Sequence, residues 1–561
     1  MKKLRDKNKI YIQDWLQLKP YEKQVNSDIY YLKLANKLKD LFIRELADEN
    51  GVVDTFFGSD DELTLLACFL TSYFEDIISG TNIWNTFVRK HKELYHKELP
   101  FFEIDEDYIY GEINHEDISF LLWYFVNTVN DDHVTHPTNI FFQLLPIRIM
   151  KIFEAEYEVA PENQHLKKYY QLNHNETELY PVRDVIRNIL FSTYLFYPDT
   201  FLTFDIEVRE IIAEAKQKND KKEVTLMFLR EAELTVLNSI HTKLLHMKGK
   251  EWLAAILGEH HPLHQDILNC SERVFGLFFY KGEDKNDVFI EHVASAMQFK
   301  LTKKSIDFPF PINNIDDIVY IGIQQWKNEW WFSGNVVPVP FDADLILDEK
   351  NSVEAKKAVN FISHTQNEAT IKSILANQEK AFLELNNNSP IVFLPKKDLE
   401  KFQTNYMEYY NNSLNLSEKE KEEAVQRARK EGYFGNAETQ SEDYKAMLAS
   451  NEIESALLFF NSKSGLEIAF GINSAFPTTT NPFYNEKDCI DHTFMLLFED
   501  DFSTELALYC VNNFKDESIF FDEFEDDYLD DLDFVLRFYK GSNYLAKPEI
   551  TLTGIDHLKV V

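Results

Sequence analysis

The amino-acid sequence predicts an α+β protein, with a helical N-terminal domain followed by a mixed α/β C-terminal half. Glycine (16) and proline (17) are scarce among the 561 residues, which argues against a turn-rich all-β protein. Before residue 270, apolar residues recur every three or four positions, as in amphipathic helices. After residue 270 they tend to alternate with polar residues, as in strands.

The N-terminal part contains several segments with helical spacing. Ser59 and Glu62 precede one of them as a capping box, because Ser59 can accept a hydrogen bond from an exposed amide and Glu62 can reach back toward the cap. We expect helices over residues 28–47, 62–79, 116–127, 144–158, 182–197, 206–218 and 224–247.

Short alternating runs predict strands in the second half, and helical spacing returns over 353–385 and 418–431. Lys327-Asn-Glu329 separates two aromatic arms, and asparagine tolerates the positive φ of a tight turn, so we expect an antiparallel Trp-rich hairpin. The expected strands are 275–281, 287–293, 297–302, 317–326, 329–338, 390–394, 456–461, 466–472 and 534–539.

These patterns predict a chain of several domains. Charged, Asn-rich stretches at 386–389 and 411–423 indicate connections around a helical insert. We expect a helical domain over 1–268, an α/β domain over 269–400, a helical connector over 401–450 and an acidic α/β lobe over 451–561.

The sequence also indicates where in the cell the protein is located. The charged first ten residues are not followed by the apolar core of a signal peptide, and no apolar run approaches the ~20 residues of a membrane span. We therefore expect a cytoplasmic protein that does not contact a membrane. The four cysteines have no paired spacing, so we expect free, buried thiols at Cys68, Cys270, Cys489 and Cys510.

The formal net charge of −36 is the strongest compositional feature. An acidic surface repels phosphate backbones, which disfavours direct binding of bulk nucleic acid and favours a basic cytosolic protein as the partner. Acidity also promotes solubility without any specific partner, and that alternative stays open.

Trp326, Trp330 and Trp331 are the candidate ligand-binding residues. Side chains alternate across a strand, so Trp330 and Trp331 lie on opposite faces of the returning arm. Either the strand is covered on both faces, or one indole lines a cleft and stacks on a planar or cationic ligand. The covered strand is the commoner arrangement for large aromatic residues.

Two segments carry side chains that could bind a metal. Pro262 separates His261 from His264, so these rings and His260 do not share a helical face, and a polar turn before a helix over 263–274 explains them. The other segment precedes Pro137 and contains Asp131, Asp132, His133 and His136. Neither segment has the His-Glu-x-x-His spacing of a zinc site, and we expect no metal and no other cofactor.

Residues 516–533 form an acidic segment that no Lys or Arg interrupts. Apolar residues at helical spacing (Phe521, Phe524, Tyr528 and Leu532) give it an expected buried stripe. A solvated helix face, a docking surface for a basic protein and a cation site are the three interpretations. The candidate partner-binding residues are Asp526, Asp527, Asp530 and Asp531.

Residues 11–21 (YIQDWLQLKPY), 70–80 (LTSYFEDIISG) through 90–95 and 99–101, and 116–123 (EDISFLLW) resemble an uncharacterised bacterial cytosolic family, domain of unknown function 3843. The resemblance extends through the hairpin at 326–334. It implies no activity and supplies no site residue.

No dinucleotide-binding loop, phosphate-binding loop of the Walker type or nucleophile elbow is present in the sequence. We therefore favour a binding or scaffold protein whose acidic surface docks a basic partner, and a role other than catalysis. The alternative is a hydrolase-type enzyme with its site in the cleft between the helical and α/β halves. Its site would use Asp131, His133 and His136, or an aromatic pocket at Trp326 and Trp331.

Overall fold

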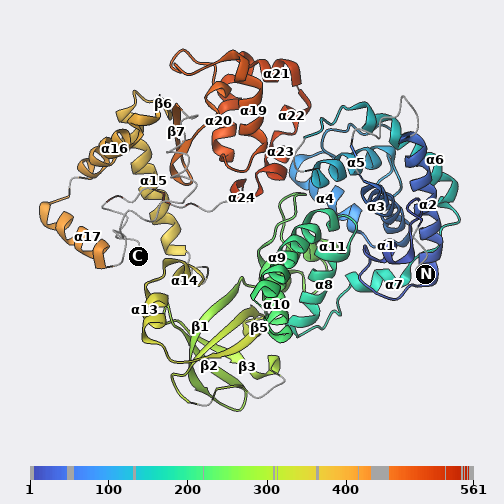
Figure 1. Cartoon of the computed structure of the whole chain (residues 1–561), viewed down its shortest axis with the longest axis horizontal. Helices are drawn as coiled ribbons and strands as arrows, with labels where there is room; N and C mark the ends of the chain where they lie inside the picture. Colours follow the sequence, from blue (N-terminus) through green and yellow to red (C-terminus); the bar gives the residue numbers. More distant parts are fainter. Residues whose placement is uncertain are drawn as a thin grey trace. The chain divides into compact units, whose positions relative to one another are not determined.

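The computed structural model confirms the α+β class (Figure 1). Its contacts divide the chain into two compact units, Met1–Phe341 and Asp342–Val561. The change from helices to strands near residue 270 therefore lies inside the first unit. The structure describes residues 6–46, 56–57, 59–130, 134–218, 220–306, 310–312, 314–359, 361, 365–414, 416–430, 454–524, 526–544, 548, 550–551 and 554.

Helices fill the first unit up to Leu268, and most of them follow the expected segments. Two end earlier than expected, α8 at Ser192 and α10 at Ser239, because the backbone becomes extended at Thr193 and at Ile240. A π-helical turn, Tyr197–Phe201, leads into α9. The helices are α1 (Ile12–Leu16), α2 (Asn26–Leu46), α3 (Asp60–Ser79), α4 (Ile83–Tyr95), α5 (His115–Val129), α6 (Ile140–Tyr157), α7 (Gln164–Lys167), η1 (Lys168–Tyr170), α8 (Leu179–Ser192), α9 (Leu202–Lys218), α10 (Lys222–Ser239), α11 (Gly249–Leu257) and α12 (His264–Leu268).

Helix α3 is the central helix of this unit, and both of its ends are capped. The Ser59 hydroxyl accepts a hydrogen bond from the Glu62 amide at 3.2 Å and donates to the Glu62 carboxylate at 2.9 Å. Gly80 ends the helix at a φ of 59°, a left-handed conformation that glycine adopts without steric cost. No single helix in the described ranges has the length and apolar character of a membrane span, although α3 and α4, bent by 87°, meet that test as a pair.

Five strands close into a barrel in the order β1-β2-β3-β5-β4. The β3–β5 pair is parallel and the other neighbouring pairs are antiparallel. Lys327 and Asn328, with φ of 48° and 65°, connect β4 to β5, and helix α10 packs on β5 (Figure 1). The strands are β1 (Arg273–Glu283), β2 (Asp287–His292), β3 (Gln298–Thr302), β4 (Ile318–Trp326) and β5 (Glu329–Val339).

The helix expected over 263–274 is wrong beyond Leu268. Helix α12 ends there because the chain turns toward the barrel and enters β1 at Arg273. The apolar residues of its second half, such as Val274, are strand residues buried in the barrel.

The second unit contains a three-stranded antiparallel sheet in the order β6-β7-β8. Helices α15 and α16 supply Phe382, Tyr406 and Tyr410 to a core shared with Leu458 and Phe460 of β7. The elements are α13 (Ala343–Asn351), α14 (Val353–Lys357), α15 (Thr365–Leu385), β6 (Ile391–Pro395), α16 (Leu399–Ser413), α17 (Glu418–Lys430), β7 (Ser455–Asn461), β8 (Gly465–Ala469), α19 (Cys489–Phe498), α20 (Thr504–Phe514), α21 (Ile519–Phe524), α22 (Asp526–Asp530), α23 (Leu532–Tyr539) and α24 (Gly541–Tyr544).

The strand expected over 534–539 is wrong, because these residues belong to helix α23. Aromatic and β-branched residues favour strands, and they dominate this short run. Phe534 and Phe538 stack one helical turn apart, with ring centroids 6.0 Å from each other, and both are buried. Tertiary burial of one helix face therefore outweighs local strand propensity here.

Candidate functional site

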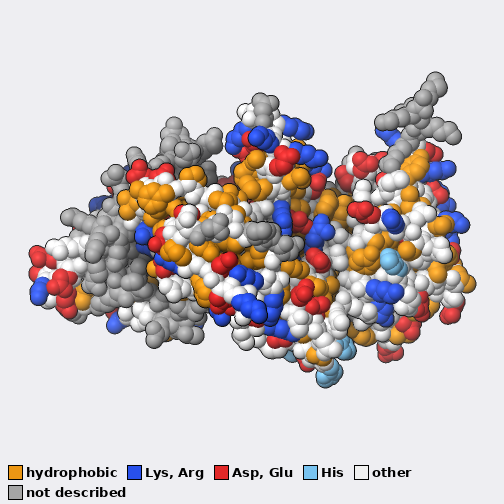
Figure 2. All heavy atoms as spheres, turned by 90° about the horizontal axis from the view of Figure 1, so that it is seen from below, with side chains coloured by type: hydrophobic (Ala, Val, Ile, Leu, Met, Phe, Trp, Pro, Cys, Tyr) orange, Lys and Arg blue, Asp and Glu red, His pale blue; other side chains and the backbone are white. Residues whose placement is uncertain are grey.

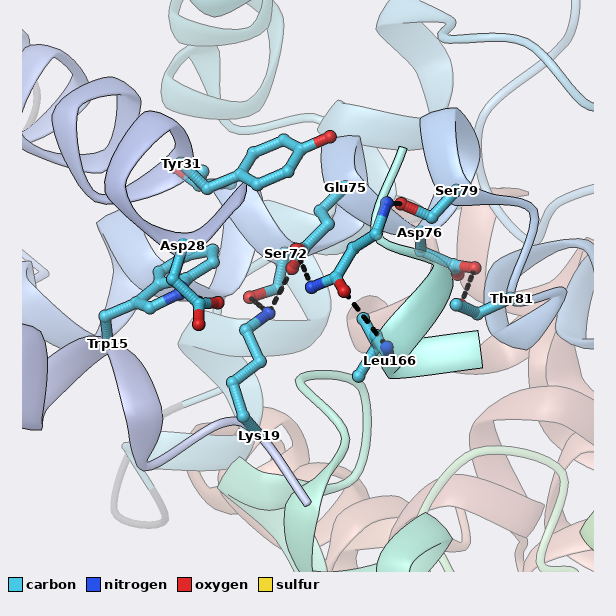
Figure 3. A network of polar contacts seen from close by, with 12 residues as sticks. Trp15, Lys19, Asp28, Tyr31, Ser72, Glu75, Asp76, Ser79, Thr81 and Leu166 are labelled. Atoms are coloured by element: carbon cyan, nitrogen blue, oxygen red, sulfur yellow. Dashed lines mark hydrogen bonds and ion pairs between the residues drawn. The ribbon is translucent and has the colours of Figure 1, made fainter. Parts of the chain in front are cut away.

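A buried polar network joins the start of the chain to helix α3 (Figure 3). The Lys19 ammonium contacts the Glu75 carboxylate and donates to the Ser72 hydroxyl at 3.0 Å. The Asn163 amide donates to the other Glu75 oxygen at 2.8 Å. The Lys19 and Glu75 side chains are 1% and 0% exposed, so neither charge is hydrated and each depends on the other.

Asp28 anchors the same region from helix α2. Its carboxylate accepts hydrogen bonds from Trp15 Nε1 at 3.0 Å, from the Tyr21 hydroxyl at 2.9 Å and from the Val25 amide at 2.6 Å. Residues 11–21 and 70–80, two of the stretches that carry the family resemblance, therefore meet in this network. Because its carboxylates are hydrogen-bonded and buried, we interpret the network as a structural device.

Asp117, on the first turn of α5, is a second buried carboxyl group. It accepts hydrogen bonds from the hydroxyls of Tyr73 at 2.8 Å and Tyr108 at 3.0 Å, and from the Asn114 amide at 3.2 Å. These donors favour the ionised form, but burial outweighs them and raises the pKa of Asp117 to about 7. Asp117 therefore changes its charge near neutral pH.

This pKa predicts a pH dependence of stability. The Asp117 carboxyl binds its proton more tightly in the folded chain than in the unfolded chain, where its pKa is about 4. Its contribution is therefore present at low pH and is lost as the pH rises through about 7. Between pH 6 and pH 8 we expect Asp117 to lower the free energy of unfolding by about 1.4 kcal/mol.

Urea unfolding of the wild type and of Asp117→Asn at these two pH values measures this contribution. Other groups titrate equally in both proteins, so the difference between the two pH slopes isolates Asp117. Equal slopes would show that Asp117 is ionised throughout this range.

A cavity with a volume of about 600 Å³ lies between α5, α6 and the segment after α4. We call it the acidic pocket. Its wall is largely apolar, with Phe101, Phe102, Pro137, Phe142, Ile147 and Met150. Three carboxylates also line it, those of Glu103, Glu116 and Glu154, together with the basic side chains of His115 and Lys151.

Glu116 is the buried carboxylate of the acidic pocket, at 5% exposure. Its Oε2 lies 3.3 Å from His115 Nδ1, and its Oε1 accepts a weak 3.4 Å hydrogen bond from the Asp105 amide. Ligand atoms of Asp105, His115 and Glu116 lie within 4.8 Å of one another, close enough to hold a metal ion. However, His115 and Glu116 begin helix α5, and a helix N-terminus favours anions over cations, which already explains the carboxylates.

Helix α6 is apolar on two sides. Phe142, Ile149 and other large residues of one side are buried in the unit. On another side Ile140, Leu144 and Ile147 are 56%, 41% and 48% exposed, at the four- and three-residue spacing of one helix face. We call these three residues the apolar stripe, and Ile147 connects it to the acidic pocket. Exposed apolar patches of this kind mark interaction surfaces.

The tryptophans of the β4–β5 hairpin lie mostly inside the first unit. Trp326 is fully buried and donates from Nε1 to the Thr177 carbonyl at 3.1 Å, and Trp331 is 1% exposed. Trp330 is half-buried and packs edge-on against Phe299. Burial favours the covered-strand interpretation for Trp326 and Trp331, because neither offers an exposed ring face.

The barrel is a further feature of the first unit that could be compared with known binding folds. Some five-stranded barrels bind oligonucleotides or oligosaccharides, and the barrel of this chain also has five strands, with a parallel β3–β5 pair. A fold does not define a function, however, and several lysines of this barrel are paired with carboxylates. Lys300 contacts Asp287 at 3.0 Å and Lys304 contacts Glu329 at 2.7 Å. We assign no site to the barrel.

The acidic segment 516–533 is divided among short helices instead of forming one long helix. Phe521 and Tyr528 are buried, as the apolar spacing indicates. Asp530 is exposed, whereas Asp531 is 5% exposed, and their role in partner binding stays a prediction. The side chains of Asp526 and Asp527 lie outside the described residues.

The histidine segments do not assemble a ligand set in the described residues. His261 Nδ1 accepts from the Leu263 amide, whereas His264 Nδ1 lies 3.0 Å from the Ala254 carbonyl. In the other segment Asp131, Asp132 and His133 lie outside the described residues, and His136 Nδ1 lies 2.6 Å from the Thr138 hydroxyl. The proposed hydrolase site therefore stays a prediction.

The acidic pocket was missed by sequence reasoning because its walls come from three separate segments. One signal could have indicated it. Residues 140–150 (IFFQLLPIRIM) are more apolar than a helix with a single buried face requires.

The fold and pockets define an α+β protein with a helical, pocket-bearing first unit that includes a small barrel. Residues 9–286 match the model of the family described as "Protein of unknown function (DUF3843)", and this part of the chain belongs to that family. The match covers the helices of the first unit, the buried network and the acidic pocket, and ends before β2. No curated protein and no solved structure matches the chain.

Proposed function

We propose that the protein is a binding protein that docks a basic, amphipathic segment of a partner protein on the acidic pocket and the apolar stripe. The observation that carries this proposal is the exposed, regularly spaced stripe beside a pocket lined by three carboxylates. The exposed apolar side chains favour binding because a partner would remove them from water, and the carboxylates favour a positively charged partner.

The geometry suits a helical or extended segment that has one apolar face and one basic face. Apolar side chains of the partner would cover Ile140 and Leu144, in the manner of an amphipathic helix on an apolar surface. A Lys or Arg side chain could then reach Glu103 or Glu154 at the rim of the pocket. Its apolar stem and its charge both suit the aromatic wall formed by Phe101 and Phe102.

Net charge contributes in a second way. A chain with a formal charge of −36 attracts basic partners over distances beyond contact, which speeds association. Charge alone does not define the docking face, because acidic and basic side chains are intermixed on the face drawn in Figure 2. The specific site therefore depends on the combination of apolar stripe and carboxylates.

We also propose a cytoplasmic location. Cys68, Cys270, Cys489 and Cys510 are free and buried, as expected of thiols in a reducing compartment.

Fluorescence anisotropy with a labelled peptide of leucine and lysine at helical spacing tests the docking proposal. We expect this peptide to bind, and a leucine–glutamate peptide of the same pattern not to bind. The double variant Glu103→Gln/Glu154→Gln should weaken binding roughly two- to thirtyfold, since each exposed charge pair contributes ~0.2–1 kcal/mol. The double variant Leu144→Ser/Ile147→Ser should weaken it about tenfold or more by removing apolar contact area.

Matched controls separate the site from the general acidity of the chain. Glu210→Gln/Glu223→Gln removes two exposed carboxylates from helices α9 and α10, and Ile206→Ser/Leu226→Ser removes two exposed apolar residues from the same helices. Both should leave the affinity nearly unchanged. If the control and site variants weaken binding equally, the peptide is held by net charge and the proposal fails.

A further inference from the structure

A second cavity of about 360 Å³ lies among the α3–α4 connection, residues 167–174 and the end of α11. It differs from the acidic pocket in its chemistry. No carboxylate lines it, and its basic wall residues are Lys167, His174 and His261. We call it the basic pocket. In a chain with a formal charge of −36, a cavity lined by basic groups without acids is a local reversal of charge.

Lys167 supplies the full positive charge of this pocket. Its ammonium lies against Gly80, 3.6 Å from where a β-carbon on that residue would be. Within the described part of the chain it forms no ion pair, unlike Lys19, which is matched by Glu75. Its charge is therefore available to a ligand.

Neutral polar groups also line this pocket. The His261 Nδ1 accepts a hydrogen bond from the Leu263 amide at 3.2 Å, so the proton of the neutral ring is on Nε2. That Nε2 is buried against the Leu172 backbone, so it is turned into the chain and does not reach a ligand in the pocket. Burial also lowers the pKa of His261, which favours the neutral ring. Asn82 adds an exposed amide that does not cap α4.

Helices α3 and α11 both end at this pocket, and the partial negative charge of a helix C-terminus acts against an anion. One carbonyl near each of these ends is already occupied, however. The Asp76 carbonyl accepts from the Gly80 and Thr81 amides, and the Ala254 carbonyl accepts from the Gly258 amide. The ammonium of Lys167 is the full positive charge on the pocket wall, whereas the carboxylates of Asp76 and Glu75 lie behind the wall, where they help to raise the pKa of Tyr170.

We propose that the basic pocket binds a small molecule through a phosphate group held by Lys167 and Asn82. The donor set favours phosphate over carboxylate. A carboxylate is best matched by the planar fork of an arginine, and no arginine lines this pocket. Separate donors on different elements, with a lysine as the point charge, suit the tetrahedral oxygens of a phosphate.

The test is saturable broadening of the ³¹P NMR signal of inorganic phosphate by the full-length protein, at constant ionic strength. We expect Lys167→Met to weaken phosphate binding about tenfold or more, because it removes a charged hydrogen-bond donor. Lys168→Met is the matched control, since Lys168 is the exposed neighbour of Lys167 and does not line the pocket. This control should change the affinity less than twofold.

Asn82→Asp provides a second variant that keeps the fold. The side chains have the same size, and both residues tolerate the φ of 66° at this position. Aspartate is a good N-cap, so the melting temperature should not fall, whereas the added charge should weaken phosphate binding several-fold. The proposal is overturned by unsaturated binding to the wild type up to roughly 50 mM phosphate, by equal effects of the two lysine variants, or by acetate competing as well as phosphate.

Discussion

Lys19→Met should lower the free energy of unfolding of the first unit by about 3–5 kcal/mol, because Glu75, whose pKa burial already raises, must then stay charged without a counter-ion or take up a proton. Both side chains are essentially inaccessible to water, so no hydration compensates for the loss. The methionine retains the apolar stem of the lysine, and the effect therefore reports the charge. All seven tryptophans precede residue 342, so the fluorescence change on urea unfolding monitors this unit.

Two further proteins make this test specific. In Lys19→Met/Glu75→Gln the uncompensated charge is gone, and we expect part of the lost stability to return, by about 1–3 kcal/mol. Lys37→Met removes an exposed lysine that pairs with Glu156 at 3.0 Å, and should cost less than about 1 kcal/mol. Similar losses for Lys19→Met and Lys37→Met would show that the buried pair is not a main support of the fold.

Trp331→Ala should lower the free energy of unfolding by about 3–5 kcal/mol, because a large buried side chain is replaced by a cavity. The Trp331 ring is 1% exposed and packs edge-on against Tyr180 at 5.8 Å, where the barrel meets helix α8. Trp330→Ala is the natural comparison on the next position of β5. Its half-buried ring should contribute less, about 1–2 kcal/mol.

The same urea unfolding experiment measures both tryptophan variants through the tryptophans that remain. A urea unfolding curve for Trp331→Ala that matches the wild type would mean that the ring is not part of the core. It would then favour the ligand-platform interpretation of the hairpin.

Much of the fold could be predicted where burial and local spacing agree. In α3, Leu63, Leu66 and Leu70 recur at helical intervals and are all buried, and the serine before the helix caps it. Residues 534–539 could not be predicted, because strand propensity and helical burial conflict there and only tertiary packing decides between them. The local sequence therefore predicts an element correctly only where the spacing of its buried residues agrees with its local secondary-structure propensity.

The candidate site was harder to predict than the fold. The apolar character of α6 can be read from the sequence, but which of its faces stays exposed depends on the packing of α5 against it. Glu103, Glu116 and Glu154 are ordinary acidic residues in an acidic chain, and no local motif distinguishes them. They become a site only when three segments bring them to one apolar cavity.

Hydrogen–deuterium exchange of the full chain, with and without the leucine–lysine peptide, tests the docking proposal most directly. We expect slower exchange in the bound state over 99–105, 115–119 and 137–154, the segments that form the acidic pocket and the apolar stripe. We expect no change over 516–533. Protection confined to residues 516–533, or spread evenly over exposed acidic helices, would contradict the assignment of the acidic pocket and the apolar stripe as the docking site.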